Sequence, residues 1–182
     1  MISRIPRLLA LPGIVIHELA HYYFCLLAGA RVHDVVFFSF GYPAGYVVHT
    51  APRRYSSHLL ITLGPLVVNT LLAILLFAVV RTTYGEIAAV GLTRADGVDY
   101  ARLLVSGWLS ASVALQALPS TGDAASLWQV TSWHLKHRHY FVVLGLPVVG
   151  LIYAANYLRA VFIDWFYAAG LGVLTWWLVG RS

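Results

Sequence analysis

The amino-acid sequence predicts an all-α polytopic membrane protein with about five transmembrane helices and a small membrane-associated β-hairpin after the first of them. Of the 182 residues, 60% are hydrophobic and only 10% are charged, whereas about 25% of the residues of a soluble domain are charged. Several apolar stretches approach the roughly 20 residues that a helix needs to cross a bilayer. The six Trp and eleven Tyr suit the aromatic belts at the two membrane surfaces.

The apolar stretches give the order of the predicted spans. They cover residues 8–28, 57–80, 101–118, 140–158 and 162–179. Residues 81–100, with their three acidic side chains, are predicted to be a solvated connector, and residues 124–138 an amphipathic helix. Because no long linker or repeat divides these elements, residues 1–182 are expected to form one membrane domain. Its catalytic core covers about 8–138, and two additional spans follow within about 140–180.

The segment between the first two spans has the pattern of a β-hairpin. Residues 32–38 are rich in β-branched and aromatic side chains, Gly and Pro interrupt the pattern at 41–45, and residues 46–48 resume it. An unpaired strand edge cannot face lipid. The hairpin is therefore expected in a protein-lined cavity or at the membrane surface.

Charge and cysteine content exclude two kinds of site. The net charge of +5 comes without a basic cluster of the kind that follows nucleic-acid phosphates, so no nucleic-acid partner is expected. Cys25 is the only cysteine. The chain therefore forms no internal disulfide and offers no cysteine-based zinc site.

The chemistry of the first span is concentrated in His17-Glu18-Leu19-Ala20-His21. Residues i and i+4 share one face of a helix, so the imidazoles of His17 and His21 converge and can bind one zinc ion. Glu18 lies close enough to act on a metal-bound water. Ionisable side chains are costly inside a span and indicate function, so the motif predicts a metal site rather than two core histidines.

A catalytic zinc site normally has a third protein ligand. Asp123 follows a Pro/Gly break after the third span, and its carboxylate either completes the site or caps the helix that follows. The residues alone leave both roles open. Asp164 is expected in an interfacial turn. Three histidines are expected on a membrane-surface face: His134, His137 and His139.

Asn69 is the other polar residue inside a predicted span. Its amide can donate to a developing oxyanion in a reaction or to a neighbouring helix in a bundle. The residue pattern alone favours the interhelical hydrogen bond.

Taken in order, these elements resemble the site-2 protease family of intramembrane zinc metalloproteases. The likeness covers most of the first 125 residues, beginning with the histidine motif in a span and the β-rich segment 32–48. Gly64-Pro65-Leu66-Val67-Val68-Asn69 is similar to the family's Gly-Pro-x-x-x-Asn element, and Pro119 with Asp123 follows the third span.

The resemblance implies which residues do the chemistry. His17, His21 and Asp123 are expected to hold one Zn2+ per chain, with Glu18 as general base for a zinc-activated water and Asn69 as a catalytic residue that contacts the substrate. The hairpin is expected to supply an edge strand for an extended substrate. Its expected substrate contacts are Val35, Val36, Phe37, Phe38 and Val47.

The implied activity is that of a zinc metalloendopeptidase that cleaves peptide bonds in or near transmembrane segments of membrane proteins. Its expected partners are a transmembrane substrate and the bilayer of a plasma membrane, with the active site toward the cytoplasmic side. The distribution of charge does not set the orientation, and the sequence predicts no oligomeric state.

Two other functions stay open at the level of the sequence. One is a non-proteolytic zinc-binding membrane protein, which Glu18 argues against because a structural metal site needs no general base. The other is a small ion transporter, which the hairpin and the scarcity of further intramembrane charges argue against.

Overall fold

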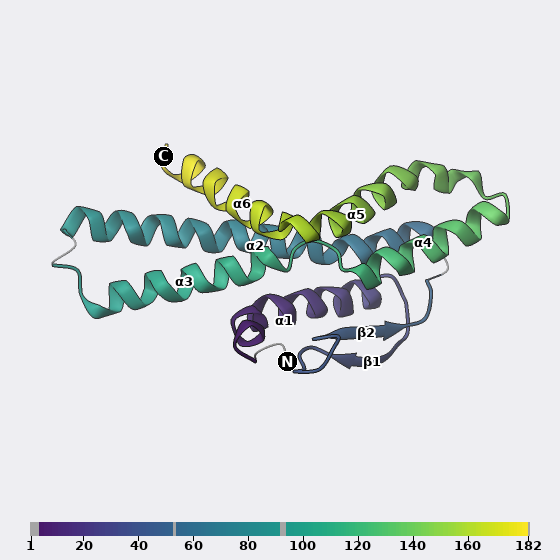
Figure 1. Cartoon of the computed structure of the whole chain (residues 1–182), viewed down its shortest axis with the longest axis horizontal. Coiled ribbons are helices and arrows are strands. Elements are labelled where there is room, and N and C mark those ends of the chain that lie inside the picture. Colours follow the sequence, from purple (N-terminus) through teal and green to yellow (C-terminus); the bar gives the residue numbers. More distant parts are fainter. Residues whose placement is uncertain (1–3, 53, 92–93, 182) are drawn as a thin grey trace.

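The computed structural model describes residues 4–52, 54–91 and 94–181, and it is largely helical (Figure 1). In chain order the elements are α1 Arg4–Leu27, β1 Val32–Val36, β2 Tyr46–His49, α2 Tyr55–Val90, α3 Gly97–Leu115, α4 Thr121–Lys136, the 3-10 helix η1 Tyr140–Gly145, α5 Leu146–Leu158, the 3-10 helix η2 Arg159–Val161 and α6 Ile163–Val179.

Helix α2 is the axis around which the other elements are arranged. It lies along the long direction of the molecule, and α3 followed by α4 runs back beside it (Figure 1). Helix α1 packs against both α2 and α3 and carries the two strands on its far side, whereas α6 contacts α2 and α3 from another side. The break between α3 and α4 therefore lies beside the middle of α2, where α1 also passes.

Among the residues that the structure describes, three segments are long and apolar enough to cross a membrane: Arg7–Leu27, Tyr55–Val90 and Tyr140–Leu158. They indicate a membrane protein, as predicted. Helix α6, Ile163–Val179, is apolar but shorter, and α3 begins with a polar turn that contains Asp99 and Arg102. The count of five spans therefore stays a prediction.

The predicted connector at residues 81–100 is wrong over its first half, because α2 continues to Val90. This end of the helix has buried side chains: Thr83 and Ile87 are 0% and 1% exposed. Of the two charged residues in this part, Glu86 pairs with Arg102 at 3.1 Å, whereas Arg81 packs over the ring of Trp176 in α6. The 36 residues of α2 extend about 54 Å at 1.5 Å each, so the helix is longer than the roughly 30 Å of a hydrocarbon core.

The predicted β-hairpin is confirmed as a two-stranded antiparallel sheet. Val36 pairs with Tyr46 and Val35 with Val47. The connecting segment contains the Gly/Pro stretch of the sequence, and Arg7 of α1 donates to the carbonyls of Phe40 and Gly41. The tip of the hairpin is thus held against the start of α1.

Two glycines allow α1 to approach its neighbours closely. A Cβ atom at Gly64 of α2 would collide with the ring of Phe24 in α1, and one at Gly13 of α1 would collide with the Ser112 carbonyl of α3. Small residues at such crossings are typical of membrane helix packing. The crossings place the histidine face of α1 opposite α2 and the end of α3.

Replacing Gly64 with Ala should lower the stability of the protein in detergent by about 1–3 kcal/mol, because the added methyl group overpacks the contact with Phe24. The matched control is Gly107→Ala in α3, where a Cβ meets no described atom within 4 Å. That control should melt at the wild-type temperature or slightly above it. Thermal unfolding followed by tryptophan fluorescence makes the comparison, and a Gly64→Ala protein as stable as the control would contradict the close contact.

Candidate metal centre

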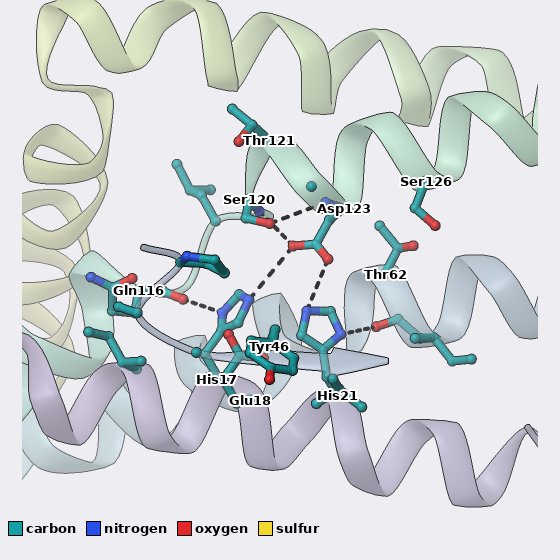
Figure 2. Close-up of a pocket in the computed structure, with 18 of the residues that line it drawn as sticks. His17, Glu18, His21, Tyr46, Thr62, Gln116, Ser120, Thr121, Asp123 and Ser126 are labelled. Atoms are coloured by element: carbon teal, nitrogen blue, oxygen red, sulfur yellow. Dashed lines mark hydrogen bonds and ion pairs between the residues drawn. The ribbon is translucent and has the colours of Figure 1, made fainter. Parts of the chain in front are cut away.

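Two histidines of α1 and one aspartate of α4 point toward one another (Figure 2). His17 and His21 are 7% and 8% exposed, and their ring centroids lie 4.8 Å apart. The Nε2 atom of His21 lies 3.1 Å from Oδ1 of Asp123, and that of His17 lies 3.7 Å from Oδ2. The structure therefore brings together the three residues that the sequence predicted as zinc ligands.

The separations are compatible with one metal ion, such as zinc, between the three residues. Zinc binds imidazole nitrogen and carboxylate oxygen at about 2.0–2.2 Å, and two ligands at the tetrahedral angle are then about 3.4 Å apart. The two measured separations, 3.1 and 3.7 Å, lie on either side of this value. All three ligand atoms lie within 4.8 Å of one another, so small side-chain rotations suffice to enclose an ion.

Backbone carbonyls fix which nitrogen of each ring faces the centre. Nδ1 of His17 lies 2.6 Å from the carbonyl oxygen of Gln116, and Nδ1 of His21 lies 3.0 Å from that of Ile61. A carbonyl oxygen only accepts hydrogen bonds, so each Nδ1 carries the proton. In the neutral rings the two Nε2 atoms present lone pairs, and they face the carboxylate of Asp123.

This arrangement of acceptors calls for a positive charge. Lone pairs of His17 and His21 facing a carboxylate are satisfied either by a proton on each ring or by one shared cation. A zinc ion satisfies the same three atoms with one charge centre, so the residues present fit the metal.

The carbonyl of Ile61 is available to His21 because of a proline. In an α-helix the carbonyl of residue 61 would accept from the N–H of residue 65, but Pro65 lies inside α2 and has no N–H. The unused carbonyl accepts from His21 instead. This accounts physically for the Gly-Pro element of the sequence: Gly64 allows α1 to approach, and Pro65 supplies the acceptor.

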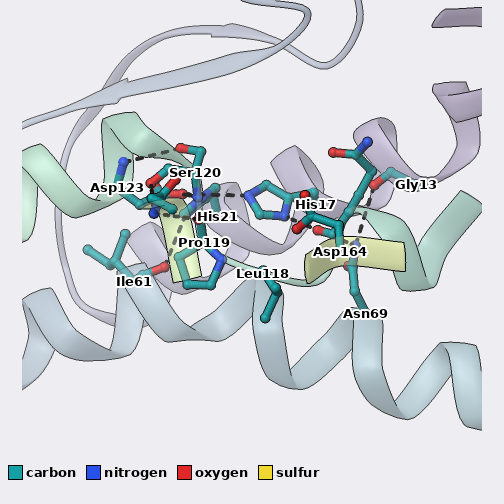
Figure 3. A network of polar contacts seen from close by, with 12 residues as sticks. Gly13, His17, His21, Ile61, Asn69, Leu118, Pro119, Ser120, Asp123 and Asp164 are labelled. Carbon is teal, nitrogen blue, oxygen red and sulfur yellow. Dashed lines mark hydrogen bonds and ion pairs between the residues drawn. The ribbon is translucent and has the colours of Figure 1, made fainter. Parts of the chain in front are cut away.

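Asn69 lies behind the site rather than in it. It is 0% exposed, and its amide donates to the carbonyls of Gly13, Val113 and Gln116 at 3.5, 3.4 and 3.1 Å. Gln116 is also the acceptor for His17, so Asn69, which Figure 3 shows beside Gly13, helps to hold the carbonyl that orients that ring. This is the interhelical hydrogen bond that the residue pattern favoured.

Asp123 takes part in the capping box of α4 while its carboxylate faces the two histidines. Helix α4 begins at Thr121 with Ser120 as its N-cap, and Asp123 is the third helical residue. Its Oδ2 accepts from the Ser120 N–H at 2.7 Å, while the Ser120 hydroxyl accepts from the Asp123 N–H at 3.1 Å. The alternative in which Asp123 is the N-cap of a helix starting at residue 124 is wrong, because the helix begins at Thr121 and Ser120 is its N-cap. The capping box holds the carboxylate toward the histidines.

The last helices hold the break that carries Asp123. The side-chain amide of Asn156 donates to the carbonyls of Pro119 and Ser120 at 3.2 and 3.4 Å, and Arg159 donates to that of Leu118 at 3.0 Å. Arg159 is in turn held by Asp164 at 3.1 Å and by Asn156. The roles of Asn156 and Arg159 were not predicted from the sequence, although both are polar residues at the end of a strongly apolar stretch.

A cavity of about 830 Å³ opens onto the three ligands and Glu18. Glu18 is half-buried, and Gly45 of the hairpin lies so close that a Cβ there would be 2.6 Å from Glu18 Cγ. The wall of the cavity includes Arg159 and Asp164, so the expected turn residue Asp164 also borders the site.

The hairpin residues that line this cavity differ in part from those predicted as substrate contacts. Val47 lines it, together with a run from Tyr42 to Tyr46. The other four predicted residues are not among the described residues that line it: Val35, Val36, Phe37 and Phe38. The ring of Phe37 packs on Tyr22, with centroids 6.1 Å apart. The alternation of side chains along a strand could not predict these lining residues. Most of them lie in the turn between the two strands, which folds over Glu18.

Comparisons of the chain with protein-family models, with curated proteins and with solved structures give no match. The likeness to site-2 proteases therefore rests on the motifs and their order.

Replacing Pro65 with Ala should weaken zinc binding about 10–100-fold, which is the usual effect of disturbing the partner of a ligating histidine. The restored N–H at residue 65 competes with His21 for the Ile61 carbonyl. Competition with a fluorescent chelator measures the affinity. Pro147→Ala is the control, because Pro147 lies in the first turn of α5, where a helix has no use for the N–H. Equal zinc affinity in the Pro65→Ala and wild-type proteins would show that the Ile61 carbonyl does not orient His21.

Proposed function

We propose that this protein is an intramembrane zinc metalloprotease that hydrolyses peptide bonds in or near transmembrane segments of membrane proteins. The observation that carries the proposal is the convergence of His17, His21 and Asp123 at the spacing of zinc ligands, with Glu18 in the same cavity. When bound, zinc supplies a water of lowered pKa and a positive charge for the oxygen of a polarised carbonyl.

The protein's own residues divide the remaining work. The Glu18 carboxylate accepts a proton from the attacking water and passes it to the leaving amine. Hydrolysis thus converts one peptide bond and one water into a carboxylate and an amine. Asn69 acts as a positioning residue through the Gln116 carbonyl, in place of the direct substrate contact that the resemblance implies.

The cavity favours an extended substrate. A peptide carbonyl inside a helix is already hydrogen-bonded, so the cleaved segment must unwind before water can attack it. Strand β2 borders the cavity through Tyr46 and Val47, and a strand beside it offers backbone groups to an extended peptide. In line with the resemblance, we place the active site toward the cytoplasmic side of a plasma membrane.

Glu18→Gln should keep zinc bound and lower the rate of cleavage by about 10²–10⁴-fold or more, because the amide cannot accept the proton of water. The assay uses purified protein in detergent with a panel of single-span membrane peptides, and gels report the products. Glu86→Gln is the control, since Glu86 lies on the exposed outer end of α2.

Three outcomes separate the candidate functions. Cleavage by wild type and control but not by Glu18→Gln supports the protease. Cleavage by Glu18→Gln at the wild-type rate would remove Glu18 as the general base. Zinc binding without cleavage of any peptide by the wild type would favour the non-proteolytic zinc-binding protein.

A further inference from the structure

A second group of histidines lies beside the metal cavity. His49 ends strand β2, His58 lies near the start of α2, and His134 lies in the last turn of α4. All three line a groove of about 730 Å³ between these elements. His49 and His58 also line the cavity of the candidate metal centre, so they stand on the boundary between the groove and the site.

One ring nitrogen of His58 is buried and has no hydrogen-bond partner among the described residues. The side chain is only 3% exposed. Its Nε2 forms a hydrogen bond with the Ser126 hydroxyl at 3.2 Å, and its buried Nδ1 has no hydrogen-bond partner among the described residues. Buried polar atoms of this kind are almost always paired, so the vacant nitrogen indicates a ligand that completes it.

His49 and His134 each have a ring nitrogen that can also bind a cation. The ring centroid of His49 lies 6.3 Å from that of His58, and because its Nδ1 donates to the Thr50 carbonyl at 2.9 Å, its Nε2 presents a lone pair. The Nδ1 of His134 is also buried without a partner in the part of the chain that the structure describes. Burial, then the neighbouring His139 and His137, lowers the pKa of His134, which favours the neutral form of the ring that binds cations.

We propose that His49, His58 and His134 form a second binding site for a transition-metal cation of the zinc type, weaker than the first, from which the ion passes to the inner site. Imidazole nitrogens suit zinc, copper and nickel, whereas magnesium and calcium prefer oxygen. The transfer step rests on the proposed metal centre, but the second site itself does not.

The predicted difference in affinity follows from geometry and charge. Among the described residues, only His17, His21 and Asp123 already have ligand atoms within 4.8 Å of one another. The outer histidines come from three separate elements and must rotate to close on an ion. They also lack a carboxylate, so the outer site holds a dication less tightly and releases it more readily.

The test counts zinc ions on metal-stripped protein in detergent by equilibrium dialysis over a range of zinc concentrations. The wild type should bind two ions, the second at least 10-fold more weakly than the first. His17→Ala/His21→Ala should keep only the weak ion, and His58→Gln/His134→Gln only the tight one. His33→Gln, an exposed histidine of β1, is the control and should bind both.

The outcomes distinguish this inference from the proposed function. One tight ion in the wild type and none in His17→Ala/His21→Ala would overturn the second site and leave the first intact. An ion that survives His17→Ala/His21→Ala but disappears in His58→Gln/His134→Gln supports the second site even when the first fails. If the buried His58→Gln change prevents folding, His134→Gln alone replaces the pair. Retention of the weak ion with unchanged affinity in that variant would then overturn the site.

Discussion

Two backbone carbonyls orient the imidazole rings of His17 and His21 at the candidate metal centre. Both carbonyls lack an acceptor role within their own helices. Ile61 offers its carbonyl because Pro65 has no N–H, and Gln116 offers its carbonyl because α3 ends there. Each accepts from the Nδ1 of one histidine. Both Nε2 atoms are thereby turned toward Asp123, which helix α1 by itself could not achieve, since a helix sets only the positions of the two Cβ atoms.

The break between α3 and α4 is the second constraint on the site. Irregular backbone at membrane depth must find hydrogen-bond partners within the protein, and the carbonyls of residues 118–120 find them in Asn156 and Arg159. The C-terminal helices are therefore part of the architecture of the site. The same break contains Ser120, whose capping box with Asp123 directs the Asp123 carboxylate toward the histidines. One irregular segment thus ends α3, begins α4 and positions a candidate metal ligand.

The sequence was most informative where spacing alone fixes geometry. Residues four apart on a helix share a face, so the histidine pair could be placed without a structure, and the strand pattern gave the hairpin. It was misleading at residues 81–90, where the charged residues Arg81 and Glu86 of a long helix resembled a connector. It could not show which carbonyls Asn69 contacts or which hairpin residues line the cavity, because those depend on which carbonyls and which turn lie opposite. The role of Pro65 was equally hidden, since it appears only once α1 is packed against α2.

The most direct test of the account is zinc K-edge X-ray absorption on protein loaded with one equivalent of zinc, for the wild type and Asp123→Ala. The account predicts a first shell of nitrogen and oxygen atoms at about 2.0–2.2 Å with the scattering pattern of two imidazoles. In Asp123→Ala the carboxylate oxygen should leave the first shell and the spectrum should change, while both imidazoles remain. A shell without imidazole in the wild type, or one unchanged by Asp123→Ala, would contradict a centre built from His17, His21 and Asp123.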